Sequence, residues 1–416
     1  MPTMRHFAII GSGPAGCYLA DSLQRLAPDA HIDVLERLPV PFGLVRYGVA
    51  PDHQATKAVV RVLDKVLGRE RISFFGNLEV GRDVSLEELM ALYDAVVLAT
   101  GAASDRRLGI PGEALAGVLG SGAFVGWYNA HPDWRAPPPG TVRSAVVIGN
   151  GNVAIDVVRI LAKEPSEMAG SDIDPAAHAH LAAQPIETVH IVGRRRAADA
   201  KFTQHELAEL GTLARARVSV ADPGALDGDT QEIEVLRGFA AGATAREAAP
   251  VSIVFHFGLT PTAFLGDAGL EAVRFSRADG SALELPADLA VTCIGYESVA
   301  CDKVVPESGL FANQDGRIDD GLYVTGWAKR GPSGTIPTNR TEAQQVAKRI
   351  AAEVVDHGRA GAEGLAALLA KRGVQRVDHP SWRKIDVAEQ ARAASDRCRR
   401  KFDCVADMLG AIGRAD

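Results

Sequence analysis

Three glycines near the start of the chain have the spacing of a pyrophosphate-binding turn. Gly11, Gly13 and Gly16 form the pattern G-x-G-x-x-G in "IIGSGPAG", directly after a strand-like segment. The first glycine permits a tight turn, the second lets a pyrophosphate approach the backbone, and the third lets helix and strand pack closely. Glu36 follows at the end of "DVLER", where a carboxylate can accept hydrogen bonds from ribose hydroxyls. The pattern predicts a dinucleotide site with an unphosphorylated ribose.

A second turn of the same kind occurs in the middle of the chain. "VVIGNGNVAIDVVRIL" places Gly149, Gly151 and Ala154 in the same order, again after a strand-like segment. At the end of the next strand stand Arg194 and Arg195, where a carboxylate would repel a phosphate. Paired guanidinium groups bind a 2′-phosphate well, so this site is predicted to bind NADP(H). The neighbouring Arg196 is interpreted either as a third contact or as a solvated side chain.

The two turns together predict an electron-transfer protein. The economical assignment is FAD in the first site and NADPH in the second, with hydride moving from nicotinamide to flavin and electrons then passing elsewhere. A further glycine turn, "VVLATG" (96–101), follows another apolar strand and suits a sheet end lined by cofactor.

The segments that must position these residues alternate between strand and helix patterns. "RHFAIIG", a helix from about Pro14 to Leu26 and the strand "HIDVLER" form one unit; "VRSAVVIG", a helix near 152–161 and "ETVHIVG" form another. This alternation predicts an α/β fold with mostly parallel sheets and two Rossmann-like dinucleotide-binding domains. Residues 163–187 are expected to form a long insertion, and 222–250 loops and short strands.

Composition limits the function classes. The chain has 416 residues, a net charge of −7 and no apolar run long enough for a membrane span, so neither nucleic acid nor membrane is an expected partner. Five scattered cysteines without a C-x-x-C pair suggest free thiols in a reducing cytoplasm, and no metal site is predicted. No signal-peptide pattern is found at the start, which favours the same compartment.

Longer motifs resemble one family. "PFGLVRYGVAPDHQATK" (41–57), "FTQHELAEL" and "GWAKRGPSGTIPTN" are similar, in this order, to adrenodoxin reductase and its bacterial ferredoxin–NADP reductase relatives. The resemblance implies an NADP domain inserted into an FAD domain, with the FAD domain at 1–103 and 320–416, the latter including C-terminal helices, and the NADP domain at 104–319. It also implies electron transfer from NADPH to an acidic [2Fe–2S] ferredoxin, which serves a cytochrome P450 or another iron–sulfur-dependent enzyme.

The resemblance implies two sets of cofactor contacts. The FAD set comprises Ala15, Glu36, Leu44, Val80, Trp327, Gly334, Thr335 and Ile336, in addition to the first glycine turn. The NADP set comprises Arg106, Asn150, Gly151, Asn152, Val153, Arg194, Arg195, Glu206 and Gly334. His53 and Glu209 lie on family motifs and resemble a proton-handling catalytic pair; a purely structural histidine is the alternative.

Two departures from the family are visible. The turn after the arginines reads "GRRRAAD" in place of G-R-R-G-P, and "SDRCRRKFDC" near the C-terminus carries two unexpected cysteines, interpreted as independent thiols. For the ferredoxin, we expect docking on a basic face of the NADP domain at Arg215, Arg217 and Arg237, with scattered solvated arginines as the alternative.

Other functions remain as alternatives. A flavin disulfide reductase would need a cysteine pair beside the flavin, and a reductase subunit of glutamate synthase would bring a cysteine-rich cluster segment; neither pattern is present. An NADPH-dependent flavin reductase or diaphorase with another acceptor, and a non-catalytic nucleotide-sensing relative, are the remaining possibilities.

Overall fold

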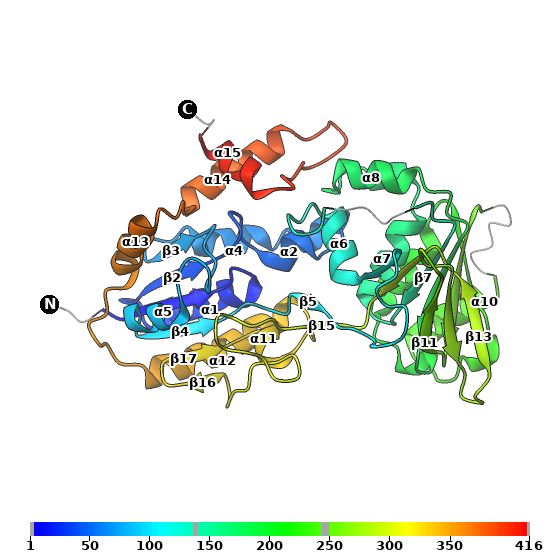
Figure 1. Ribbon diagram of the computed structural model, residues 1–416, viewed down its shortest axis with the longest axis horizontal. Coiled ribbons are helices and arrows are strands. Elements are labelled where there is room, and N and C mark those ends of the chain that lie inside the picture. The colour runs from blue at the N-terminus through cyan, green and yellow to red at the C-terminus, as the bar shows by residue number, and fades with distance from the viewer. Residues whose placement is uncertain (1–3, 136–139, 243–248, 414–416) are drawn as a thin grey trace. The chain divides into compact units, whose positions relative to one another are not determined.

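The computed structural model describes residues 4–135, 140–242 and 249–413, and the chain divides into two compact units (Figure 1). Unit 1 is formed by Met1–Ser104 and Tyr296–Asp416, and unit 2 by Asp105–Gly295. One unit is therefore inserted into the other. The strands β16 (Arg317–Asp319) and β17 (Leu322–Val324) pair with each other in the sheet of unit 1.

Unit 1 is built on a six-stranded sheet of order β16-β17-β4-β1-β2-β3, in which only β16 runs antiparallel to its neighbour. The other strands are β1 (His6–Ile10), β2 (His31–Leu35), β3 (Ile72–Phe75) and β4 (Ala95–Leu98). Its helices are α1 (Pro14–Leu26), α2 (Gly43–Tyr47), α3 (Gln54–Lys57), α4 (Val60–Leu67), α5 (Leu86–Leu92), α11 (Trp327–Arg330), α12 (Ile336–Glu353), α13 (Gly361–Arg372), α14 (His379–Ala391) and α15 (Val405–Gly413).

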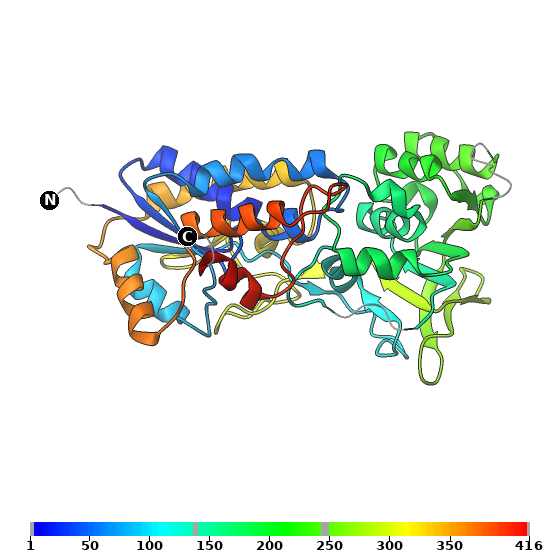
Figure 2. The same cartoon turned by 90° about the horizontal axis from the view of Figure 1, so that it is seen from above.

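Alternate residues of the unit 1 strands face two different cores. Phe7 and Ile9 of β1 join the cluster formed with α1, α4 and α12, whereas Ala8 and Ile10 join the cluster formed with α5 and α13. Successive side chains of a strand point to opposite faces of the sheet. Because both faces are buried here, the sequence of β1 is a continuous apolar run. Figure 2 shows α14 and α15, coloured orange to dark red, beside each other, and the two helices are in contact.

Unit 2 contains a six-stranded parallel sheet of order β6-β14-β7-β8-β10-β9. Its strands are β6 (Val118–Gly120), β7 (Ser144–Ile148), β8 (Thr188–Gly193), β9 (Ala216–Val220), β10 (Val251–Phe257) and β14 (Leu289–Thr292). The helices are α6 (Ser121–Tyr128), α7 (Asn152–Ala162), α8 (Pro175–Ala182), α9 (Gln204–Glu209) and α10 (Gln231–Ala240). A small antiparallel sheet consists of β11 (Thr260–Leu265), β12 (Ala272–Ser276) and β13 (Ala282–Pro286).

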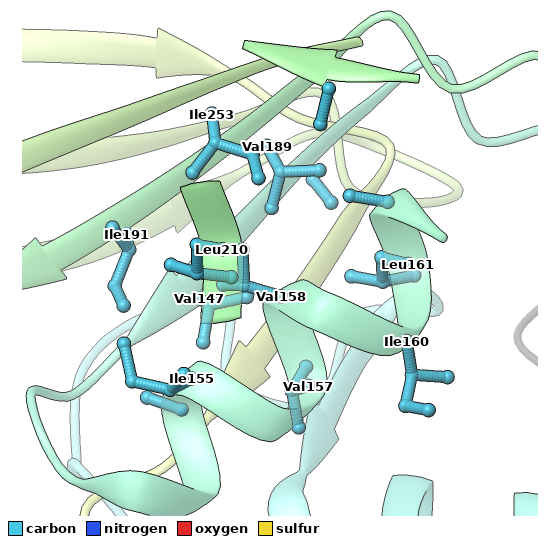
Figure 3. Close-up of a cluster of buried hydrophobic side chains, with 14 of the residues drawn as sticks. Val147, Ile155, Val157, Val158, Ile160, Leu161, Val189, Ile191, Leu210 and Ile253 are labelled. Carbon is cyan, nitrogen blue, oxygen red and sulfur yellow. The ribbon is translucent and has the colours of Figure 1, made fainter. Parts of the chain in front are cut away.

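Helices cover one face of the parallel sheet of unit 2 and the small sheet covers the other. Figure 3 shows Ile155 and Val158 of α7 directed toward Val147 and Ile191 of the strands. On the opposite face, Val146 packs with residues of β11–β13. The segment 222–250, expected to hold loops and short strands, instead contains α10, and its residues 243–248 lie outside the described ones.

The remaining short elements are β5 (Ser104–Asp105) and β15 (Tyr296–Glu297), and four 3₁₀ turns at 165–168, 197–199, 210–212 and 223–225. Within the described ranges, none of the helices has the length and apolarity that crossing a membrane requires.

Candidate functional site

The first glycine turn connects β1 to the N-terminus of α1. Gly11 has φ of +113°, and a side chain there would overlap the Ala99 carbonyl oxygen. A side chain on Gly16 would overlap the Gly11 carbonyl oxygen, so this glycine permits the close crossing of helix and turn. Apart from its chain neighbours, no atom of the described residues lies within 4 Å of where a Cβ on Gly13 would be. Gly13 therefore leaves an open cradle in front of the amides that begin α1, as a bound pyrophosphate requires.

Glu36 is held beside this turn by the turn itself. Its Oε2 accepts hydrogen bonds from the Ser12 hydroxyl at 2.7 Å and the Ser12 amide at 3.2 Å. Its Oε1 accepts one from the Leu38 amide at 3.2 Å. Each carboxylate oxygen can accept more than one hydrogen bond, so Glu36 retains capacity for ribose hydroxyls. The predicted pairing of glycine turn and acid is present in the fold.

Two buried hydroxyl groups at the same edge of the sheet lack partners. Thr100 follows β4 and Thr325 follows β17, and both strands run parallel to β1. The Oγ1 atoms of Thr100 and Thr325 are buried and have no hydrogen-bond partner among the described residues. Because buried polar groups are normally paired, these orphaned hydroxyls fit a ligand that completes the edge. Sequence reasoning found the turn at 96–101 but not these two groups.

The loop that begins α11 packs against the first glycine turn. Gly326 has φ of +70°, and a Cβ on it would lie 2.5 Å from the Cβ of Ala15. Trp327 is next in the chain, stacks on Tyr296 with ring centroids 6.1 Å apart and donates from Nε1 to the Ser333 carbonyl. The predicted contacts Ala15 and Trp327 therefore lie on adjoining segments.

One buried carboxylate that the motif search missed anchors this loop. Glu342 of α12 accepts a hydrogen bond from the Gly326 amide at 2.9 Å and ion-pairs with Lys329 and Arg330. Its signal in the sequence is weak, because an acid two turns along a helix is ordinary. Its partners Gly326, Lys329 and Arg330, in contrast, belong to the family motif "GWAKRGPSGTIPTN".

The other predicted FAD contacts also lie in unit 1. Leu44 is in α2 and is 43% exposed, and a Cβ on the adjacent Gly43 would lie 3.5 Å from the Cα of Gly13. Val80 is half-buried, two residues beyond Leu78, whose amide donates to the Glu36 carbonyl at 2.9 Å. Gly334, Thr335 and Ile336 form the start of α12, where Thr335 and Thr338 make a capping box. Their roles as contacts stay predictions.

The second glycine turn connects β7 to α7 and repeats the geometry of the first. Gly149 has φ of +145°, and a side chain there would overlap the Cys293 carbonyl oxygen. Gly151 has open space around its missing Cβ, and Ala154 is fully buried against the sheet. The turn thus offers a second open cradle at a helix N-terminus.

Two asparagines of this turn connect it to α9. The Asn150 carbonyl accepts from the amides of Lys201 and Phe202, and Asn152 Oδ1 accepts from the Thr203 amide at 2.8 Å. Asn150 Oδ1 is buried and has no hydrogen-bond partner among the described residues, so it fits a ligand donor. Glu206, in the first turn of α9, is thereby placed in the same region as Asn150 and Asn152, while Val153 begins α7 and packs partly against the core.

The three arginines after β8 have different environments. Arg196 ion-pairs with Asp227 at 2.9 Å and Asp199 at 3.5 Å, so it is neither free nor simply solvated. Arg194 and Arg195 are exposed and have no ion pair within the described part of the chain. Two unpaired guanidinium groups at the end of β8 are what a phosphate monoester requires.

The remaining predicted site residues are distributed between the units. His53 precedes α3 in unit 1, whereas Glu209 ends α9 in unit 2 and lies 3.3 Å from the buried Arg159. Arg106 is an exposed residue of unit 2 whose amide donates to the Gly295 carbonyl. The catalytic pairing of His53 with Glu209 stays a prediction, as does the placement of Gly334 in both contact sets.

Two of the three arginines expected to dock a ferredoxin also make contacts within unit 2, and their docking role stays a prediction. Arg215 donates to the Leu161 and Ala162 carbonyls at 3.3 Å, which satisfies the C-terminal end of α7. Arg237 pairs with Glu234 and donates to two loop carbonyls. Their sequence positions could not reveal this, because the carbonyls come from other segments.

The cysteines do not form a redox pair. Within the described residues, Cys17, Cys293, Cys301, Cys398 and Cys404 form no disulfide bond. Burial raises the pKa of the Cys17 and Cys293 thiols well above their usual range, and that of Cys301 to about 11. Neutral buried thiols are poor nucleophiles, which argues against disulfide chemistry at these three positions.

Each unit has a Rossmann-type glycine turn at the end of a parallel strand, and this arrangement is typical of oxidoreductases that bind two dinucleotides. Residues 5–210 match the family described as pyridine nucleotide-disulphide oxidoreductase. The chain is 40% identical to cindoxin reductase of Citrobacter braakii, over 97% of this chain and 90% of that one. It is 39% identical to the NADPH-ferredoxin reductase FprA of Mycobacterium tuberculosis, over 97% and 98%.

A solved structure of the same Mycobacterium tuberculosis protein, in complex with NADPH, superimposes with a TM-score of 0.92 at 38% identity, covering 99% of this chain and 100% of that one. The chain therefore belongs to the family of NADPH-dependent ferredoxin and adrenodoxin reductases. The expected fold class, enzyme class and cofactors, FAD and NADP(H), are confirmed by this membership.

Proposed function

We propose that this protein is a ferredoxin–NADP⁺ reductase that binds FAD in unit 1 and NADPH in unit 2 and passes electrons to a [2Fe–2S] ferredoxin. The assignment of FAD to unit 1 and NADPH to unit 2 rests on one observation: the two glycine turns have similar geometry but different charged residues beside them. Glu36 stands beside the first, where it suits free ribose hydroxyls. Unpaired Arg194 and Arg195 stand at the second, where they suit a 2′-phosphate.

In unit 1 the FAD would be held by backbone and hydroxyl groups. The amides at the start of α1 would bind the pyrophosphate, with the partial positive charge of the helix N-terminus. Thr100 and Thr325 offer the unpaired hydroxyls, and Trp327 a flat aromatic surface. The start of α12 at Thr335 and Ile336 presents a second helix N-terminus, which would stabilise negative charge on a reduced ligand.

In unit 2 the amides at the start of α7 would bind the NADPH pyrophosphate. Asn150 Oδ1 would accept a hydrogen bond from the ligand, and Arg194 and Arg195 would clamp the 2′-phosphate. Arg106 and Glu206 are proposed as further contacts. His53 and Glu209 are proposed to hold or move a proton during turnover. Within unit 2, Arg159 Nε lies 3.3 Å from Glu209 Oε2 and would hold this carboxylate in place.

The two cofactors supply, when bound, hydride donation and the conversion of one two-electron step into two one-electron steps. The protein would position the two cofactors. Each would bind at a glycine turn that connects a parallel strand to the N-terminus of a helix. The ferredoxin that receives the electrons is proposed to be acidic and to serve a cytochrome P450 or another iron–sulfur-dependent enzyme. The five scattered cysteines, without a C-x-x-C pair, support a reducing cytoplasm as the location.

Purification and an anaerobic titration test the proposal. The protein should carry noncovalent yellow flavin, and NADPH should bleach it much faster than NADH. Addition of a [2Fe–2S] ferredoxin should then increase NADPH-dependent reduction of cytochrome c. Flavin that NADPH does not bleach would favour a non-catalytic nucleotide-sensing relative, and bleaching without any stimulation by ferredoxin would favour a diaphorase with another acceptor.

A further inference from the structure

One turn of unit 1 brings the starts of two helices together. A Cβ on Gly326, which precedes α11, would lie 2.5 Å from Ala15 Cβ and 3.7 Å from Asn339 Oδ1. Ala15 belongs to the N-terminal end of α1 and Asn339 to that of α12, and these two helices pack against each other. Figure 1 shows α11 and α12 in the same part of unit 1 as α1. Two helix N-termini, each with a partial positive charge, therefore meet at Gly326.

This meeting point adjoins the proposed FAD site. Thr325, which precedes Gly326, is fully buried, and its Oγ1 has no hydrogen-bond partner among the described residues. Ala15 lies in the helix turn whose amides would bind the FAD pyrophosphate. A dinucleotide bound at the first glycine turn would therefore lie beside Gly326, and charges fixed around Gly326 would act on it.

Two cations and one carboxylate surround the same turn. Glu342 of α12 is 8% exposed, its Oε1 lies 3.4 Å from Lys329 Nζ, and its Oε2 pairs with Arg330. The Gly326 amide donates to the same Oε2 at 2.9 Å. Within the described part of the chain, neither Lys329 nor Arg330 has a second ion pair. One carboxylate for two cations leaves one positive charge uncompensated in this cluster, which we call the Glu342 cluster.

Neutral groups hold the cluster in place. Arg330 Nε donates to the Ser333 carbonyl at 3.2 Å, and Arg330 Nη2 donates to Asn339 Oδ1 at 3.0 Å. The Ser333 carbonyl also accepts a hydrogen bond from Trp327 Nε1 at 3.1 Å. The guanidinium is thus tied to the loop and to the start of α12 without any loss of its charge. Water screens such a fixed, half-buried charge less than it screens a mobile charge on the surface.

We propose that the Glu342 cluster sets the midpoint potential of the flavin bound in unit 1. The inference rests on the proposed function, which places FAD beside this turn. Reduced flavin carries more negative charge than oxidised flavin, so a net positive charge nearby favours the reduced form. Lys329 supplies the surplus positive charge and Glu342 limits it. The two residues act on the flavin through their charges, and their removal should therefore have opposite effects.

Two substitutions that change the charge of the cluster in opposite senses test the proposal. Glu342→Gln keeps an oxygen that can accept from the Gly326 amide and raises the charge by one. Lys329→Met keeps an unbranched side chain and lowers the charge by one. Glu353→Gln is the matched control, because Glu353 ends the same helix and pairs with Arg349 at 2.8 Å. At 1.5 Å per residue, Glu353 lies roughly 16 Å further along the helix axis than Glu342.

The midpoint potential is measured on each holoprotein by anaerobic reduction in the presence of a reference dye of known potential. Thermal unfolding of each apoprotein is recorded separately, so that a loss of stability is distinguished from an effect on the flavin.

Glu342→Gln should raise the midpoint potential and Lys329→Met should lower it. In each case the ratio of reduced to oxidised flavin at a fixed potential should change about tenfold, which is about 30 mV for a two-electron couple. Glu353→Gln should keep the wild-type potential, although its apoprotein should unfold at a lower temperature. If Glu342→Gln does not fold, Lys329→Met decides alone: a lower potential supports the proposal and an unchanged one overturns it.

Potentials that stay unchanged in both cluster variants, or that move in the same direction, would overturn the proposal and leave the placement of FAD intact. The Glu342 cluster would then serve only to hold the loop. A Gly13→Val protein that stays fully loaded with FAD would contradict the placement of FAD at the first glycine turn, and the proposal with it.

Discussion

Arg46 and Glu389 form a buried ion pair although 343 positions separate them in the chain. Arg46 Nη2 lies 2.5 Å from Glu389 Oε1, and the two side chains are 5% and 0% exposed. Glu389 also accepts hydrogen bonds from Arg399 and from the Phe402 amide. The pair joins α2, next to the first glycine turn, to the C-terminal helix α14.

Removing one partner of this pair should be costly. Glu389→Ala would leave the Arg46 guanidinium buried and unpaired, and we expect a loss of about 3–5 kcal/mol in the free energy of unfolding of unit 1. Denaturation followed by flavin fluorescence measures this loss. Glu87→Ala, which removes an exposed pair with Lys303, should cost less than about 1 kcal/mol. Equal small losses would show that the buried pair does not hold the C-terminal helices in place.

Coenzyme choice should depend on Arg194 and Arg195 but not on Arg196. Loss of one charge-assisted phosphate contact should lower kcat/KM for NADPH roughly ten- to a hundredfold, equivalent to about 1.5–3 kcal/mol, and leave that for NADH nearly unchanged. Arg196→Ala is the matched control, because its side chain is already paired with Asp227 and Asp199. If the Arg196 variant lost its preference for NADPH over NADH and the Arg194 and Arg195 variants kept theirs, the 2′-phosphate would have to bind elsewhere.

The two kinds of glycine in the first turn should respond differently to substitution. The Cβ of Gly13→Val would have no atom of the described residues within 4 Å apart from its chain neighbours, so the chain should fold but purify without flavin. Gly11→Ala forces a side chain into the Ala99 carbonyl at φ of +113°, so that variant should fail to fold. Far-UV circular dichroism and the absorbance ratio of flavin to protein separate these outcomes. A yellow, fully loaded Gly13→Val protein would place FAD elsewhere.

Unit 2 should lose stability in mild acid through a histidine pair on neighbouring strands. His190 Nδ1 and His256 Nε2 are 3.0 Å apart, and burial together with His190 and Arg277 lowers the pKa of His256 from 6.5 to about 4. Below pH 6.5 the unfolded chain binds this proton and the folded chain does not, so stability falls progressively from pH 6.5 toward pH 4. His256→Gln should reduce that decline in thermal unfolding, and His205→Gln, an exposed control, should not.

Local patterns predicted the parts of the fold that are themselves local. The turns at Gly11 and Gly149 could be predicted because a strand-to-helix turn needs a residue with positive φ. Glu36 could be predicted because it ends the strand that pairs with β1. The helix α10 was missed in a polar segment, although Thr230 caps it and Ile233, Leu236 and Phe239 recur at helical spacing.

Contacts between distant segments could not be predicted from the sequence. The orphaned hydroxyls of Thr100 and Thr325 depend on strand order, and the burial of Glu342 depends on how α12 packs against α1. The engagement of Arg215 by the end of α7 likewise depends on tertiary structure.

The central claim is that electrons pass from NADPH through this flavoprotein to a one-electron iron–sulfur carrier. Its most direct test is an anaerobic assay that follows the absorbance of a [2Fe–2S] ferredoxin mixed with NADPH and a catalytic amount of the protein. We predict complete reduction of roughly two ferredoxins per NADPH, since a hydride carries two electrons, and a far slower reaction with NADH. Flavin bleaching by NADPH while the ferredoxin stays oxidised would contradict the claim.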